Sequence, residues 1–374
     1  MIHSVKFRHT LRSLSAAAVL ALLMFAPGPG LADGRSGNVY VPTNQPTGNS
    51  IMVFHRDAAG ALTFVGSVDS GGVGTGTGAD PLTSQGAVVL SRDNRLLFAV
   101  NAGSNSISVF AVSGDRLDLL DTVASGGTLP VSLTVRGNLL YVLNAGGTPN
   151  ISGFTIEPRT NQLVPLAGST QNLPGGIAAT PAEVSFSPDD SVLVVTEKGT
   201  NLIDTFTLED DGVARAGVSF PSSGSTPFGF AFGRDNVMIV SDAGSGAVSS
   251  YTVDEEGNVD LVTPALSDTQ AAPCWIVVPR NGRFAYTANA GSGTISSYTV
   301  GDNGNLTLLD VAAASVAHGS APTDMALTNN SRFLYVRNGG NGTISGFRLN
   351  ADGSLAPIST VGGLPPGTQG IAAR

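Results

Sequence analysis

Two carboxylates occupy a column of positions that a repeating pattern otherwise fills with small, polar or apolar residues. The sequence repeats seven times, and in each copy a strand-like segment starts at a proline or its equivalent. The second residue after that proline or equivalent is, in turn, Ala87, Ser132, Glu183, Gly229, Trp275, Asp324 and Ile371. Acidic side chains are rarely buried without a partner. Glu183 and Asp324 are therefore candidates for acid–base catalysis. The equally weighted alternative is that both are structural.

A second series of polar residues ends another strand-like segment in each copy: Asn44, Asn101, Asn144, Glu197, Asp242, Asn289 and Asn338. Asparagine suits such a position because its side chain satisfies main-chain groups of the following turn. Glu197 and Asp242 replace asparagine with an acid, so they join Glu183 and Asp324 as catalytic candidates. The ligand-binding candidates at the same end of the strands are Ser132, Lys198, Trp275 and Arg337.

Motifs for several other chemistries are missing from the sequence. It contains no G-x-S-x-G, no H-E-x-x-H, no phosphate-binding loop and no cluster of Cys and His. Cys274, the only cysteine, has no neighbouring base, so we expect a buried structural thiol. His55 and His318, the only histidines after residue 32, have no partner at ligand spacing. The glycine-rich run 70–78 is predicted to be a loop. We predict no cofactor and no metal site.

The elements that position these residues follow from an internal repeat. Segments such as LLYVLNAGGTPNISGF (139–154), RFAYTANAGSGTISSY (283–298) and RFLYVRNGGNGTISGF (332–347) share one pattern, which occurs seven times. Each copy divides into four short strands separated by turns rich in Gly, Asn, Asp and Ser. No helical periodicity follows residue 32. Seven units of four strands predict an all-β fold, a seven-bladed β-propeller.

The two ends of the repeat array are complementary. The first unit lacks its leading strand, whereas the last unit has a surplus one, residues 369–373, which resembles residues 85–89. We therefore expect the C-terminal strand to complete blade one and close the ring, which leaves few free strand edges. The alternatives are an open solenoid and two separate sandwiches. The missing first strand and the surplus last strand argue against both.

The N-terminal segment is typical of export. Residues 1–32 combine basic residues, a twelve-residue apolar run and small residues before a cleavage point, so we predict a signal peptide and a propeller over 33–374. The alternative is a retained membrane anchor. Cleavage would lower the net charge from −9 to −12. Such an acidic protein does not suit nucleic acid or membrane surfaces. We expect a periplasmic or secreted protein that is not inserted in a membrane after cleavage.

The repeat resembles the seven-bladed lactonase family, which includes 6-phosphogluconolactonases and carboxymuconate cyclases, and the YVTN-type surface propellers. The residues that carry the resemblance are 140–146 (LYVLNAG), 284–291 (FAYTANAG) and 187–190 (SPDD). The resemblance implies lactone hydrolysis or cyclisation. It matches Glu197 and Asp242 to family acids. Where the family usually shows His-Pro-His and Pro-Arg-His, this chain has Thr180-Pro181-Ala182 and Pro227-Phe228-Gly229.

Two functions compete on this basis. The first is an exported protein that binds a small molecule or a protein ligand at the mouth of the propeller channel, or acts as a scaffold, because the family's His and Arg are replaced. The second is a divergent lactone hydrolase or cyclase, with Glu183 or Glu197 as general base and Arg337 holding an anionic substrate. A weaker third is a metal-dependent version with Ca²⁺ or Mg²⁺ on the carboxylates.

Overall fold

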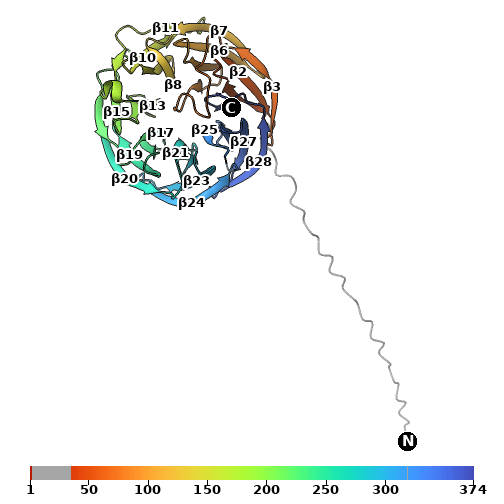
Figure 1. Cartoon of the computed structure of the whole chain (residues 1–374). Helices are drawn as coiled ribbons and strands as arrows, with labels where there is room; N and C mark the ends of the chain where they lie inside the picture. The colour runs from red at the N-terminus through yellow and green to blue at the C-terminus, as the bar shows by residue number, and fades with distance from the viewer. Residues whose placement is uncertain (2–34, 318) are drawn as a thin grey trace. The chain divides into compact units, whose positions relative to one another are not determined.

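Short alternating segments joined by glycine-containing turns form seven antiparallel sheets arranged in a ring (Figure 1). The structure, a computed structural model, describes residue 1, residues 35–317 and residues 319–374. The described residues contain one short 3-10 turn, η1 (Gly176–Ala178), and otherwise strands and loops. The predicted seven-bladed β-propeller is thereby confirmed.

Each blade has its strands in order from the channel to the rim. The innermost strands of blades one to seven are β29 (Ala372–Ala373), β4 (Val88–Leu90), β8 (Thr128–Arg136), β13 (Pro181–Phe186), β17 (Pro227–Phe232), β21 (Pro273–Val277) and β25 (Pro322–Leu327). The second strands are β1 (Gly37–Pro42), β5 (Leu96–Asn101), β9 (Leu139–Gly146), β14 (Val192–Glu197), β18 (Val237–Asp242), β22 (Phe284–Asn289) and β26 (Phe333–Asn338).

The outer half of each blade is a hairpin. The third strands are β2 (Ser50–Arg56), β6 (Ser106–Ser113), β10 (Asn150–Ile156), β15 (Leu202–Thr207), β19 (Ala247–Val253), β23 (Thr294–Val300) and β27 (Thr343–Leu349). The outermost strands are β3 (Leu62–Asp69), β7 (Arg116–Ala124), β16 (Val218–Pro221), β20 (Val259–Ser267), β24 (Leu306–Ser315), β28 (Leu355–Gly362) and, in blade three, the two pieces β11 (Leu163–Pro165) and β12 (Gln171–Asn172).

Blade three departs from the four continuous strands expected from the repeat. Both β11 and β12 pair with β10, so the outermost strand is interrupted rather than missing. Pro165 cannot donate a ladder hydrogen bond, and Gly168 has a φ of +80°, so the chain turns between the two pieces.

Ring closure occurs as predicted, through a short pairing. Ala372 and Ala373 of β29 pair with Tyr40 and Val39 of β1, which makes the last strand the innermost strand of blade one. A tyrosine hydrogen bond also crosses this junction, since the Tyr335 hydroxyl of blade seven donates to the Gly60 carbonyl of blade one at 2.7 Å. The ring is therefore closed by backbone pairing and by packing between blades.

The second strands carry the core because blades stack face to face. All six residues of β14, for example, are buried, although successive side chains point to opposite faces. The hydroxyls of Tyr141 and Tyr286 repeat the contact made by Tyr335, donating to the turn carbonyls of Gly212 and Gly353 in the next blade at 2.6 and 2.8 Å. The recurring tyrosine of the repeat therefore joins neighbouring blades.

The innermost strands begin with a backbone irregularity that determines the direction of their first side chains. The residue before each starting proline has a positive φ, as at Thr180 (+40°) and Ala321 (+45°). The pairing register then shifts between Pro181 and Glu183 and between Pro322 and Met325. Such bulges turn a strand and redirect side chains, so they set the direction of Glu183 and of its counterpart in blade seven.

Several predictions concern residues outside the described part of the chain. They are residues 2–32 of the predicted signal peptide, residues 33 and 34 of the predicted propeller, and His318. In the described ranges, no helix has the length and apolar character needed to span a membrane.

Candidate functional site

The starts of the innermost strands and the loop 79–86 meet at one end of the channel, which we call the channel mouth. Glu183 and Asp324 both lie there, and only 7% and 2% of their surfaces are exposed. The charge of Asp324 raises the pKa of Glu183. The structure therefore brings the two acids of the column together in a buried setting.

Glu183 bridges two blades. Its Oε2 accepts a hydrogen bond of 2.7 Å from the main-chain N–H of Phe230, on the innermost strand of blade five. Burial raises the pKa of Glu183 well above its ordinary value; this hydrogen bond opposes the rise, and the charge of Asp324 adds to it. A carboxyl group in this environment is held in its protonated form over a wide pH range.

Other positions near the column make the same kind of inter-blade contact. Ser132 Oγ accepts from the Val184 N–H at 3.2 Å. Gly229 has no side chain, and a Cβ there would lie 2.2 Å from Gln85 Oε1. That Gln85 oxygen instead accepts from the Ile276 N–H at 3.1 Å. A side-chain oxygen thus satisfies a main-chain donor at three successive junctions between innermost strands.

Arg337 is the buried cation of the mouth. It is fully buried, and its guanidinium donates to the main-chain oxygens of Thr323, Thr368 (2.6 Å) and Ala79 (3.2 Å), while its Nε has no hydrogen-bond partner in the described structure. Burial raises the pKa of Asp324 to about 7 against the opposing charge of Arg337.

Asp80 belongs to the same group and was not identified from the sequence. Burial raises its pKa to about 6, and the charges of Arg337 and Lys198 oppose the rise. One of its carboxylate oxygens, Oδ1, is buried without a hydrogen-bond partner among the described residues. The mouth therefore holds the acids Asp80, Glu183 and Asp324 together with the cations Arg337 and Lys198.

Lys198 and Trp275 both pack on the Phe228 ring at one side of the mouth. The Lys198 ammonium lies 4.7 Å from the centroid of the Phe228 ring and donates to Thr83 Oγ1 at 2.9 Å. Burial lowers the pKa of Lys198 to about 8. Trp275 packs edge-on against Phe228, with 5.0 Å between ring centroids, and its Nε1 donates to the Ser84 carbonyl at 3.0 Å.

Cys274, beside Trp275 in the sequence, is buried as expected. Burial raises the pKa of its thiol to about 12. A thiol that stays protonated at neutral pH is a poor nucleophile, so the structural role predicted for Cys274 agrees with its surroundings.

The loop between β3 and β4 closes the mouth. It is the longest connection between consecutive blades, and its final part crosses the channel: the Gln85 side chain donates to the Ile276 carbonyl at 2.9 Å, and the Gln85 N–H donates to the Ala182 carbonyl at 3.1 Å. Gln369 Nε2 donates to the Ser84 carbonyl at 3.1 Å. Gln85 therefore joins the innermost strands of blades four and six across the mouth.

A sequence signal for this closure exists. Five blades have a proline at or near the start of the innermost strand, whereas blades one and two have Gln369 and Gln85 at the equivalent position. A glutamine at the start of an innermost strand has an amide that can reach main-chain groups across a channel, whereas proline has none.

Glu197 and Asp242 point into their own blades rather than into the mouth. Both are fully buried. Asn101, Asn289 and Asn338 show the contact made at this position: each amide donates to the serine seven residues later, at 2.7, 2.8 and 2.9 Å. Asp242 makes the same link with opposite polarity, because its Oδ2 accepts from Ser249 Oγ. The position links the second strand to the third.

Blade four has two acids at this link. Glu197 accepts from the Gly175 N–H at 3.0 Å and from the Thr200 hydroxyl, and it lies beside Asp204, seven residues later. Burial raises the pKa of Asp204, and the neighbouring Glu197 raises it further. The Ser219 hydroxyl donates to Asp204 Oδ1, so Asp204 is a second buried acid of this blade, and the sequence pattern did not identify it.

Metal ligation has no evident centre in the described ranges, where no three His, Cys, Asp or Glu side chains form a group suited to an ion. The residues brought together at the mouth are thus Glu183, Asp324, Lys198, Trp275, Arg337 and the unexpected Asp80. Ser132 lies one inter-blade contact away, and Glu197 and Asp242 lie within blades.

Comparisons with known proteins agree with this architecture. The sequence matches the family "Lactonase, 7-bladed beta-propeller" over residues 47–177, 167–270 and 257–369. No curated protein sequence matches the chain.

Solved structures with the same fold cover nearly the whole chain. A periplasmic gluconolactonase from Pseudomonas aeruginosa shares 18% identity with a TM-score of 0.68, over 91% of this chain and 99% of its own. A candidate 6-phosphogluconolactonase from Bacteroides fragilis NCTC 9343 shares 20% identity with a TM-score of 0.69, over 92% and 99%. A Lactobacillus plantarum protein shares 18% identity with a TM-score of 0.72, over 91% and 100%. At these identities the likeness concerns the fold alone.

Proposed function

Because the chain belongs to the lactonase family of seven-bladed β-propellers, we propose that it uses the propeller to bind or scaffold a partner rather than to hydrolyse lactones. Its ligand, a small molecule or a protein, docks at the channel mouth over residues 79–86. The observation that carries this proposal is the closure of the mouth by those residues, whose Gln85 side chain bonds to both main-chain groups of Ile276.

The contacts of the mouth acids support the same proposal. Glu183 accepts the Phe230 N–H across a blade junction, and Asp324 accepts the Met325 N–H at 2.8 Å. Asp324 also has a φ of +125°, a conformation that is strained for a residue other than glycine and is held by the surrounding structure. Both carboxyl groups are already bound to main-chain N–H groups. Either one would have to give up this hydrogen bond in order to act as a general base.

The positions at which the family usually has His and Arg support it as well. They hold Thr180, Ala182, Phe228 and Gly229 here. Ala182 is fully buried, and Phe228 packs on Trp275. None of these side chains can transfer a proton or hold a carboxylate.

A hydrolysis assay tests the proposal directly. Glucono-1,5-lactone is incubated with the purified protein and with the Glu183→Gln variant, and acid release is followed at pH 7. We expect no acceleration over the uncatalysed rate in either sample. Acceleration by the wild type that is lost in a folded Glu183→Gln variant would overturn the proposal, because the amide keeps the hydrogen bond from Phe230 but removes the acid.

A divergent lactone hydrolase is the second candidate, favoured by one observation. Glu183 and Asp324 have raised pKa values through burial, beside the Arg337 cation, and such groups are common in active sites. In this alternative the loop 79–86 moves aside, Glu183 acts as general base and Arg337 holds the substrate's anionic group. This alternative predicts that the Gln85→Ala variant, in which the loop is loosened, hydrolyses lactones faster than the wild type. A rate equal to the uncatalysed rate in this variant would exclude the alternative.

Export is part of the proposal. The predicted signal peptide and the periplasmic gluconolactonase among the structural relatives support a periplasmic or secreted location. N-terminal sequencing of protein from the extracytoplasmic fraction should give a chain that starts at Asp33. Recovery of the intact N-terminus from membranes would favour the retained anchor.

A further inference from the structure

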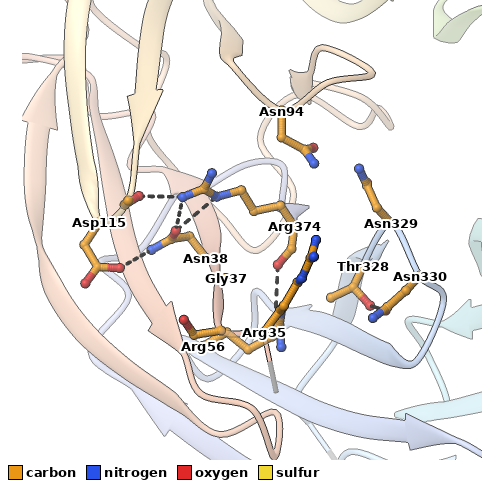
Figure 2. A pocket seen from close by; sticks show the side chains of 12 residues that line it. Arg35, Gly37, Asn38, Arg56, Asn94, Asp115, Thr328, Asn329, Asn330 and Arg374 are labelled. Atoms are coloured by element: carbon orange, nitrogen blue, oxygen red, sulfur yellow. Dashed lines mark hydrogen bonds between the residues drawn. The ribbon is translucent and has the colours of Figure 1, made fainter. Parts of the chain in front are cut away.

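A concave site lies where the ring closes, at the ends of the innermost strands opposite to the channel mouth; we call it the seam pocket (Figure 2). It has a volume of about 590 Å³. Arg35 and Arg374 flank the paired strands β1 and β29, and Arg56 ends β2. Asn94 and Asn330 lie in the turns that follow the innermost strands of blades two and seven. Blades one, two and seven therefore all contribute to it.

The seam pocket concentrates positive charge in an acidic protein. Arg35, Arg56 and Arg374 line it, whereas the chain has a net charge of −9. Its lining contains one carboxylate side chain, Asp115, which is already held by Asn38 Nδ2 at 2.7 Å and by His55 Nδ1 at 2.8 Å.

The three arginines differ from two of the three that line a neighbouring cavity. Within the described chain, none of the three forms an ion pair with a carboxylate side chain; in the larger cavity formed by blades two, three and four the same holds for Arg92, whereas Arg95 and Arg136 pair with Asp93 and Asp190. The guanidinium groups of the seam pocket thus keep donors that no carboxylate side chain of the described chain occupies.

Arg56 is the buried anchor of the pocket. Only 4% of its surface is exposed. Its Nε donates to the Arg374 main-chain oxygen and its Nη1 to the Asp57 carbonyl, both at 3.1 Å, and its guanidinium lies 5.1 Å from the Phe333 ring centroid. Its Nη2 makes no hydrogen bond to another described residue. Arginine stays charged even when buried; the nearby Asp57 charge favours the charged form of Arg56 and offsets part of the cost of burying it.

Arg374 is held in a fixed orientation beside Arg56. Asn38 Oδ1 accepts from its Nε at 3.1 Å and its Nη2 at 2.7 Å, and the Gly114 carbonyl accepts from Nη2 at 2.6 Å. Its Nη1 has no such partner among residues 35–317 and 319–374. Figure 2 shows the side chains of Asn94 and Asn329 across the pocket from Arg374. The pocket thus combines oriented guanidinium groups on one wall with amides on the other.

We propose that the seam pocket binds a small organic anion with two or more carboxylate or phosphate groups. Arg56 Nη2 and Arg374 Nη1 donate to one anionic group, and the exposed Arg35 contacts a second. A guanidinium pair recognises planar or tetrahedral oxyanions through charge-assisted hydrogen bonds. This site lies at the opposite end of the channel from the mouth, so it does not depend on the function proposed above.

Calorimetric titration of the propeller chain with citrate and with pyrophosphate, and with glycerol as a neutral control, tests the proposal and separates carboxylate from phosphate ligands. We expect saturable binding of at least one anion, no binding of glycerol, and weaker binding at higher salt. Arg35→Ala should weaken the anion's affinity about tenfold, the loss of one charge-assisted hydrogen bond. Arg35 is exposed, so this variant should fold normally.

Arg116→Ala is the matched control. Arg116 is exposed at the start of β7, next to Asp115, but it pairs with Asp118 at 2.7 Å and lies outside the lining. Its loss removes the same charge and should change the affinity less than twofold. The proposal is overturned if neither anion binds saturably, or if Arg116→Ala and Arg35→Ala weaken binding equally, which would indicate a general charge effect.

Discussion

At the end of the second strand, asparagine and aspartate make the same contact with opposite hydrogen-bond polarity. Asn289 donates to Ser296, whereas Asp242 accepts from Ser249. Burial raises the pKa of Asp242 to about 6, so the blade five link has to accommodate a buried charge at neutral pH. The asparagine links have no such charge. The acid at position 242 therefore makes the folded protein less stable at neutral pH than an asparagine there would.

Asp242→Asn should stabilise the protein at pH 8 by about 1–2 kcal/mol, because the folded protein no longer holds an ionised carboxylate in a buried site. At pH 5 the effect should be small, since Asp242 is then protonated in the folded protein. Urea unfolding at the two pH values measures both numbers. The reciprocal variant Asn289→Asp should destabilise at pH 8, and a neutral or stabilising result there would contradict the explanation.

At the scale of elements, the connection from β3 to β4 determines what the channel mouth can do. Its Gln85 side chain satisfies the N–H and C=O of Ile276 on the innermost strand of blade six. Gly229 leaves the space that this side chain fills. A loop and a missing side chain, far apart in the sequence, thus fit together and close the mouth.

Gln85→Ala should lower the free energy of unfolding by about 2–3 kcal/mol, because two buried main-chain groups of Ile276 lose their partner. The exposed Gln162→Ala should change it by less than about 0.5 kcal/mol. Hydrogen exchange at the Ile276 amide gives a local readout, and fast exchange is expected only in Gln85→Ala. Equal protection in both variants would mean that Gln85 does not hold the loop.

At the scale of the whole molecule, buried acids make stability fall as pH rises. The pKa values of Asp80, Asp242 and Asp324 are raised by burial to about 6, 6 and 7. The folded state therefore binds protons that the unfolded chain releases near pH 4. The stabilisation is complete below that pH and is lost as pH rises through 6 to 7.

We expect the free energy of unfolding to be lower at pH 8 than at pH 5 by at least about 2 kcal/mol. Lys198, whose pKa burial lowers to about 8, acts at higher pH, where stability should recover because the folded state loses a proton that the unfolded chain still holds. Urea unfolding from pH 5 to 9 follows the curve. A steady rise in stability from pH 5 to pH 8 would show that these acids are ionised in the folded protein without cost.

Closure is the second property of the whole ring. Deleting residues 369–374 removes β29 and the Gln369 amide that bonds to Ser84, and it exposes an edge of β1. We expect a fall in Tm of about 10 °C or more and concentration-dependent aggregation, since a free strand edge pairs with other chains. Deleting residues 1–32 is the control and should leave Tm unchanged. Equal Tm values for the two deletions would contradict the proposed role of β29.

The number of blades, the order of strands and the closing strand all follow from the sequence, because each repeat encodes its own strands and turns within about fifty residues. The tertiary structure alone decides where the chemical groups point. Glu183 and Asp324 face the channel because a bulge redirects the start of their strands, whereas Glu197 and Asp242 turn toward the third strand of their own blades. Gln85 meets Ile276 across 191 positions of sequence. Gln85 at a position that five blades fill with proline marks the residue involved, but its partner depends on the path of a long loop over a completed ring.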